Sequence, residues 1–216
     1  MTSTDTSAHT STEAPTTQPV ADPRPTLFAA VDQVVRLIDL VPGTALAQPT
    51  PCAEFDVRHL LGHLVAVLGR IAYVAGGGNA FDVPSMMLDI PDDAWSDRAH
   101  QGAAAVRQAW ADDAVLDRVL TLPFGTVPGR GAGVAYISEL TTHAWDLAAA
   151  IGQRHSLDDA LGAVALTAAR TFIPDTHRGE IPFGAAIPVS EGASAYDQLA
   201  AWLGRDPAWG SDGANR

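Results

Sequence analysis

The sequence predicts an all-α protein: a bundle of four long helices with short extra helices and a small extended segment. Apolar residues recur at helical spacing in several long segments, and loops rich in Pro and Gly separate those segments. An amphipathic helix must bury its apolar stripe against a neighbour, so four such helices indicate a bundle. A hydrophobic content of 47% with 18% charged residues is typical of a chain with a globular core.

The first two predicted helices each carry one apolar stripe. The first spans about residues 26–40, and the Pro-Gly pair at 42–43 ends it. The second spans about residues 57–75, with Asp56 as its expected N-cap and three glycines at 76–78 as its stop. Both helices are expected to face the core.

The rest of the chain holds two further bundle helices and several small pieces. A third helix is predicted over about residues 92–110 and a fourth from about Ala132 to Gly152. The glycines and prolines at 123–133 are expected to keep the stretch before Ala132 out of a helix interior. The remaining predicted pieces are an extended segment at 119–125, a helix at 157–172, an extended or loop segment at 183–189 and a closing helix at 195–203.

The two ends of the chain are expected to lie outside the bundle. Ten of the first 17 residues are Ser or Thr, without a basic start or an apolar stretch, so residues 1–24 are interpreted as a disordered tail and not as a signal peptide. A metal-binding helix-bundle domain is expected over residues 25–207 and a flexible tail over 208–216. A cytoplasmic location follows as the default expectation.

Charge and cysteine content exclude several classes of partner and site. The formal net charge is −12 and every fixed cation is Arg, which argues against a nucleic-acid-binding surface. The single cysteine, Cys52, excludes an internal disulfide framework and a zinc-thiolate cage. No apolar run reaches the roughly 18 residues that a membrane span needs, so no membrane partner is expected.

The fourth predicted helix carries the first candidate for chemistry. Glu139 and His143 are four residues apart, so their side chains lie one turn apart on the same face. A carboxylate and an imidazole at that spacing can share one metal ion. The same pair can also form only a hydrogen bond on a solvated face, and an isolated pattern this short favours the second interpretation.

A histidine of the second predicted helix makes metal binding by Glu139 and His143 a stronger hypothesis. His63 lies between apolar residues, where a lone histidine is more often a core residue than a ligand. Facing helices of a bundle are about 8–10 Å apart, however, so His63 can reach Glu139 and His143. Two histidines and one carboxylate leave positions open for water or substrate, as in a catalytic metal site. His59, one turn earlier, is the rival ligand and is expected nearer to the solvent.

Two motifs carry a resemblance to a known family. The segment 50–58 (TPCAEFDVR), followed by His63, resembles the entry to the second helix in the mycothiol-dependent maleylpyruvate isomerase-like, DinB/YfiT-like superfamily. The segment 139–148 (ELTTHAWDLA) resembles the second signature of that superfamily. The segments 122–125 (LPFG) and 203–207 (LGRDP) are similar to its actinobacterial single-domain branch. The resemblance covers about residues 25–207.

The resemblance implies a fold, a metal and a chemistry. It implies a DinB/YfiT-like four-helix bundle that holds a divalent metal, usually Zn²⁺, on His63, Glu139 and His143. In characterised relatives the metal activates a low-molecular-weight thiol, which is mycothiol in actinobacteria, for isomerisation or S-transfer. A cation deprotonates a coordinating thiol, and the thiolate is the nucleophile.

Other polar residues near these motifs have weaker claims. Cys52 can face the site from the preceding loop, although packing as a small hydrophobe is the more common role of a free cysteine. Asp146 shares the side of the helix that carries Glu139 and His143, where it can orient a histidine or make a structural hydrogen bond. Tyr136 can donate to an anion or line the bundle. Arg58 and Arg130 can clamp a carboxylate, although a solvated arginine is the more common case for each.

The leading hypothesis is a divalent-metal-dependent thiol S-transferase or isomerase that takes a small-molecule thiol and an electrophilic substrate. The alternative is a non-catalytic metal-binding stress or accessory protein of the DinB-like superfamily. A plain structural bundle is the third hypothesis, and Fe(II) in place of zinc is compatible with the same ligands. A homodimer is compatible with the sequence.

Overall fold

A computed structural model describes residues 21–176, 178 and 183–210 of the chain. The predicted tails at 1–24 and 208–216 therefore lie outside the described residues over 1–20 and 211–216. Within the described part, the carbonyl groups of Pro207 and Trp209 accept hydrogen bonds from Arg154.

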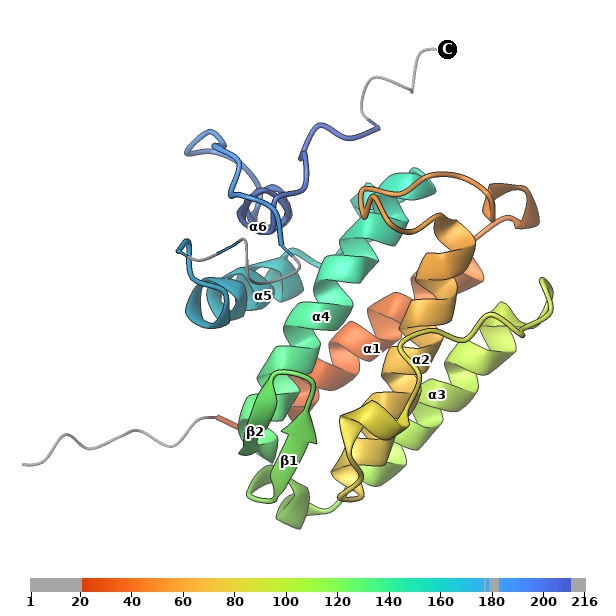
Figure 1. The fold of residues 1–216 in the computed structure, drawn as a ribbon. Coiled ribbons are helices and arrows are strands. Elements are labelled where there is room, and N and C mark those ends of the chain that lie inside the picture. Colours follow the sequence, from red (N-terminus) through yellow and green to blue (C-terminus); the bar gives the residue numbers. More distant parts are fainter. Residues whose placement is uncertain (1–20, 177, 179–182, 211–216) are drawn as a thin grey trace, which may run out of the picture.

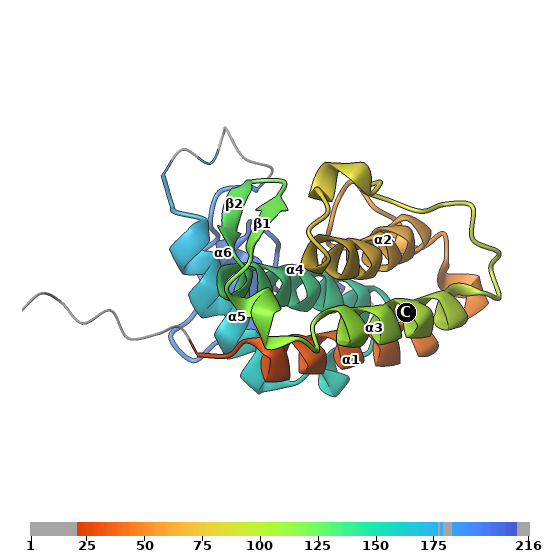
Figure 2. The ribbon, with the colours of Figure 1, turned by 90° about the horizontal axis from the view of Figure 1, so that it is seen from below.

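Four long helices form the bundle, as predicted. They are α1 (Arg24–Asp39), α2 (Val57–Ala75), α3 (Trp95–Ala109) and α4 (Gly129–Ala150). Helix α2 packs against α3 and α4, and α1 packs against the same two helices (Figures 1 and 2). The apolar stripes of all four helices are buried in one core.

Helix α2 begins and ends where its sequence predicts. The side chain of Asp56 accepts a hydrogen bond from the backbone N–H of His59 at 2.8 Å, which confirms the N-cap. At the other end Gly77 has a φ of +94°, a conformation that glycine adopts readily and other residues avoid. By length and composition this helix could cross a membrane, but 67% of its apolar window is buried inside the protein. Buried core helices commonly have the same length and apolar composition as a membrane span, so these two criteria alone do not indicate one.

Helix α4 begins three residues earlier than predicted, at Gly129 instead of Ala132. The prediction that its glycines lie outside the helix interior was wrong. A Cβ atom on Gly129 would collide with the carbonyl oxygen of Val115, and one on Gly133 would come within 2.7 Å of the Pro23 side chain. These glycines therefore allow close packing of the helix on its neighbours.

A small hairpin confirms the predicted extended segment. Strand β1 (Val119–Leu122) pairs antiparallel with β2 (Gly125–Pro128). An isolated parallel bridge joins Thr121 to Asn79, so the hairpin is connected to the segment that follows α2. That segment contains one turn of 3-10 helix at Ala80–Asp82 and is otherwise irregular, as expected.

Two further helices pack on the outside of α4. Helix α5 (Asp159–Phe172) contacts both α4 and α6 (Ala195–Trp202) (Figure 1). Trp145 of α4 belongs to the apolar cluster between them. The buried Gln33 links this layer to α1, because it donates to the Tyr196 hydroxyl at 2.9 Å and accepts from the Asp158 N–H at 2.7 Å. The segment 183–189 has no regular secondary structure.

Candidate metal centre

The face shared by α2 and α4 brings together the three ligands predicted from the sequence. His63 Nε2 lies 3.1 Å from Glu139 Oε1, and His143 Nε2 lies 3.8 Å from the same oxygen. The two imidazole rings meet edge to face with their centroids 4.7 Å apart. One donor atom from each residue lies within 4.8 Å of the other two. Such a cluster is the size of a site for a single cation.

The spacing of these donors suits a zinc ion. Zinc-to-ligand bonds of about 2.0–2.1 Å in a tetrahedral site place neighbouring donor atoms about 3.3 Å apart. The two distances to Glu139 Oε1, 3.1 and 3.8 Å, lie on either side of that value. These two distances are therefore compatible with a divalent ion, for which two imidazoles and one carboxylate are a common donor set.

Each histidine is oriented through its other ring nitrogen. His63 Nδ1 lies 2.9 Å from the carbonyl oxygen of Ser85, and His143 Nδ1 lies 2.9 Å from Asp146 Oδ2. Because carbonyl and carboxylate oxygens only accept, each Nδ1 carries the proton and donates. Nε2 of each ring is then the nitrogen that faces Glu139, and His63 Nε2 donates to Glu139 Oε1 at 3.1 Å. Metal-binding histidines are held in this way.

Asp146 is itself fixed by an arginine from the far end of the chain. The Asp146 side chain is fully buried, and it accepts from Arg205 Nε at 2.7 Å and from Arg205 Nη2 at 2.9 Å. Arg205 lies just after α6, so the Asp146–Arg205 ion pair connects the layer of α5 and α6 to the candidate metal centre. The role of Asp146 in orienting a histidine, one of the two predicted, agrees with this geometry.

Arg205 was not predicted from the sequence as a contributor to the site. It was noted only as part of a family motif, and 59 residues separate it from Asp146. A buried carboxylate needs a donor partner, so Asp146 in an apolar helix face was the one available signal. The contact with Ser85 was also not predicted, because it is made by a backbone carbonyl, which every residue type has.

The electrostatics of the cluster favour an anionic carboxylate beside the imidazoles. Burial acts to raise the pKa of Glu139, but the hydrogen bond from His63 and the charges around it lower that pKa to about 2. Burial likewise acts to lower the pKa of His63, but the hydrogen bond and charge of Glu139 raise it. The Glu139 side chain is 38% exposed, against 12% for His63 and 11% for His143. The cluster therefore opens to solvent on the Glu139 side.

Of the rival and accessory candidates, His59 and Arg58 lie apart from the three ligands, whereas Cys52 lies beside His143. His59 Nδ1 is 2.6 Å from Asp56 Oδ1, its side chain is 41% exposed, and it does not join the cluster. Cys52 is half-buried, and its Sγ lies within 4.8 Å of a ring nitrogen of His143 and of a carboxylate oxygen of Asp146. Burial raises the pKa of its thiol. Arg58 pairs with Asp92 at 2.6 Å on the surface.

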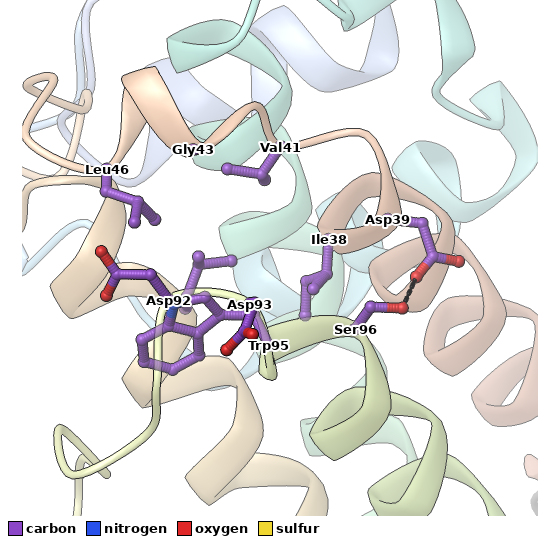
Figure 3. Close-up of a pocket in the computed structure, with 10 residues that line it drawn as sticks. Ile38, Asp39, Val41, Gly43, Leu46, Asp92, Asp93, Trp95 and Ser96 are labelled. Atoms are coloured by element: carbon purple, nitrogen blue, oxygen red, sulfur yellow. Dashed lines mark hydrogen bonds between the residues drawn. The ribbon is translucent and has the colours of Figure 1, made fainter.

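A cavity of about 190 Å³ lies elsewhere, between the end of α1 and the start of α3 (Figure 3). Trp95, Asp92 and Leu46 are among the residues that line it, and Ser96 donates to Asp39 across its edge at 2.5 Å. None of the three clustered ligands lines this cavity. It is separate from the candidate centre.

Known proteins share both the sequence pattern and the fold. Residues 27–148 match the model of the mycothiol maleylpyruvate isomerase N-terminal domain. Two uncharacterised proteins of Mycobacterium tuberculosis, from strains CDC 1551 and H37Rv, are each 35% identical over 178 residues, which is 82% of this chain and 93% of theirs.

Two crystal structures of the mycothiol-dependent maleylpyruvate isomerase, one of them a mutant, superpose with TM-scores of 0.60 and 0.57. Their sequences are 15% and 16% identical to this chain, and the match covers 78% of this chain and 74% of each of theirs. This likeness confirms the predicted DinB-like helical fold.

Proposed function

Because the chain belongs to the mycothiol maleylpyruvate isomerase N-terminal domain family, we propose that it is a divalent-metal-dependent enzyme that acts on a small-molecule thiol. The matched residues, 27–148, include His63, Glu139 and His143. The observation that carries the proposal is the convergence of these three side chains, with both Nδ1 atoms already engaged.

The side chains of this chain would hold and orient the ion. On binding the ion, His63 would give up the Nε2 proton that it donates to Glu139, so both histidines would supply neutral imidazole nitrogens and Glu139 a negative oxygen on the open side. A bound divalent cation lowers the pKa of a coordinated thiol or water, so that a nucleophile exists at neutral pH. Three protein ligands leave room for one outside ligand at a tetrahedral ion. Zinc is the proposed ion, although the same donor set also suits Fe(II).

Mycothiol is the proposed thiol. The support is the family match together with the two solved structures of a mycothiol-dependent isomerase that share this fold. The second reactant would be an electrophile. Attack by the thiolate sulfur gives S-transfer if a leaving group departs with the electron pair, and isomerisation if the thiol adds reversibly to a double bond and leaves again.

A conjugation assay tests the proposal. Zinc-loaded protein is mixed with mycothiol and 1-chloro-2,4-dinitrobenzene, in which the sulfur displaces chloride, and thioether formation is followed by absorbance. We expect a rate above that of the metal-free protein and of His63→Ala. His59→Ala is the matched control, because His59 lies one turn away and outside the cluster, and it should keep the full rate.

The outcomes separate the two functional hypotheses. Equal rates for the zinc-loaded and metal-free proteins would contradict the enzyme proposal for this substrate pair. Zinc binding without conjugation of any of several electrophiles would support the alternative, a metal-binding stress or accessory protein without turnover.

A further inference from the structure

Two buried polar side chains lie beside the candidate metal centre and take no part in it. Arg70 follows His63 by seven residues on α2, and Tyr136 precedes His143 by seven residues on α4. Seven residues are about two helical turns, so each side chain lies on the same face as its histidine and about 10 Å further along the helix. Helices α2 and α4 are in contact.

Arg70 carries a buried charge without a carboxylate partner. The residue is only 8% exposed, and within the described part of the chain no carboxylate forms an ion pair with it. Its Nη2 donates to the carbonyl oxygen of Pro84 at 3.0 Å, while its buried Nε has no hydrogen-bond acceptor among the described residues. An unpaired buried charge is costly, so a guanidinium in this position is prepared for an anion.

Tyr136 offers a second unused donor. The residue is 6% exposed, and its buried hydroxyl lacks a hydrogen-bond partner among the residues that the structure describes. Burial raises the pKa of this hydroxyl, and the nearby charge of Arg70 acts against that rise. The hydroxyl therefore keeps its proton at neutral pH and can donate. Buried polar groups in native proteins normally have partners, so the missing partner needs an explanation.

The segment 84–87 runs alongside α2 and contacts both Arg70 and His63. The carbonyl of Pro84 accepts from Arg70, the carbonyl of Ser85 accepts from His63, and the N–H of Met87 donates to the carbonyl of Gly62 at 3.1 Å. The segment 84–87 thus holds Arg70 and His63 in one row along α2. The charge of Arg70 acts on both Tyr136 and His63, and that of Glu139 acts on Tyr136, so the two donors lie near each other and near the candidate centre.

We propose that Arg70 and Tyr136 form a carboxylate-binding subsite that anchors one of the two reactants while its reacting atom lies at the metal centre. A guanidinium and a hydroxyl are both donors, and together they match the acceptor oxygens of a carboxylate. The roles of thiol and electrophile rest on the proposed function, whereas the preference for a carboxylate rests on Arg70 and Tyr136 alone.

Matched pairs of thiols test the subsite by binding, without turnover. Zinc-loaded protein is titrated calorimetrically with mercaptoacetate, 3-mercaptopropionate and 4-mercaptobutyrate, each beside its own neutral amide. In a second arm, succinate is titrated in the presence of saturating 2-mercaptoethanol. We expect carboxylate binding about 10-fold or more tighter than amide binding in the first arm, or succinate binding in the second. The responding arm identifies which reactant carries the carboxylate.

Three variants assign the effect to these side chains. Arg70→Gln should abolish the preference for the carboxylate, and Tyr136→Phe should weaken it about 5- to 10-fold. Tyr136→Phe should not lower the melting temperature, because it removes only an unpaired hydroxyl, so it remains informative if Arg70→Gln fails to fold. Arg58→Gln is the matched control on the same helix, where Arg58 is paired with Asp92 at the surface, and it should leave binding unchanged.

The subsite and the proposed function can fail separately. If the amides bind as tightly as the carboxylates and succinate does not bind, or if binding is the same in Tyr136→Phe and wild type, the subsite is overturned. If the protein takes up no zinc, the proposed function fails, and titration of the metal-free protein with succinate still tests Arg70 and Tyr136.

Discussion

Replacing Asp146 with Ala is expected to lower both the stability of the protein and its affinity for metal. Asp146 is fully buried, and it accepts from His143 Nδ1 at 2.9 Å and from two Arg205 nitrogens at 2.7 and 2.9 Å. The substitution leaves the guanidinium of Arg205, which is 11% exposed, without its counter-charge. It also frees the His143 ring to turn away from Glu139.

The size of each effect follows from these contacts. Removing one partner of a buried ion pair costs about 3–5 kcal/mol. For a chain of this length, each kcal/mol lowers the melting temperature by about 2–4 °C, so the expected loss is roughly 6–20 °C. Removing the residue that orients a metal-binding histidine typically costs about 10- to 100-fold in metal affinity. Calorimetry of the metal-free protein gives the first quantity, and competition with a zinc-binding dye gives the second.

A double variant separates the two roles of Asp146. In Asp146→Ala/Arg205→Met both charges are gone, so much of the lost stability should return. Metal affinity should stay low, because His143 still lacks an acceptor for its Nδ1 proton. Recovery of both properties together would refute the reasoning, as would an Asp146→Ala protein that melts within 2 °C of wild type and binds zinc within about threefold.

Three smaller predictions test the fold and the ligands. Asp56→Ala should cost about 1 kcal/mol and lower the melting temperature by about 2–4 °C, whereas Asp56→Asn, which keeps a capping oxygen, should cost less. Gly129→Ala should destabilise the protein, because the new Cβ atom collides with Val115. Gly131→Ala should stabilise it by up to about 1 kcal/mol, because its Cβ atom meets nothing nearer than 3.6 Å. Equal effects of the two substitutions on the melting temperature would contradict the packing argument. Zinc at 100 times its dissociation constant should stabilise the wild type by about 2.7 kcal/mol. The same zinc concentration should leave the melting of His63→Ala unchanged.

Local sequence signals were sufficient for both ends of helix α2 but not for the start of α4. In α2 an apolar stripe, an Asp cap and a glycine stop all agree, and the observed bounds, Val57–Ala75, are those predicted. In α4 the glycines gave the wrong start. Glycine is disfavoured inside a helix because of its conformational freedom, but it occurs there when a neighbour packs too closely for a Cβ atom. At Gly129 the neighbour is Val115, which the sequence alone does not place.

The candidate ligands could be predicted because helical spacing is rigid. Glu139 and His143 share a face in any helix, and a bundle supplies the facing His63. Among the groups that orient them, Asp146 was a candidate from its place on the same helix face, but the others could not be predicted. Arg205 and the Ser85 carbonyl come from distant segments. That Arg70 Nε and the Tyr136 hydroxyl have no hydrogen-bond partner among the described residues is a property of the packed structure alone.

The metal content of protein purified without a histidine tag tests the central claim most directly. Wild type is measured by elemental analysis after equilibration with zinc, beside His63→Ala and the control His59→Ala. We expect about one zinc per chain in wild type and in His59→Ala, and none in His63→Ala. No zinc in the wild type, or equal zinc in all three proteins, would contradict a metal centre at His63, Glu139 and His143.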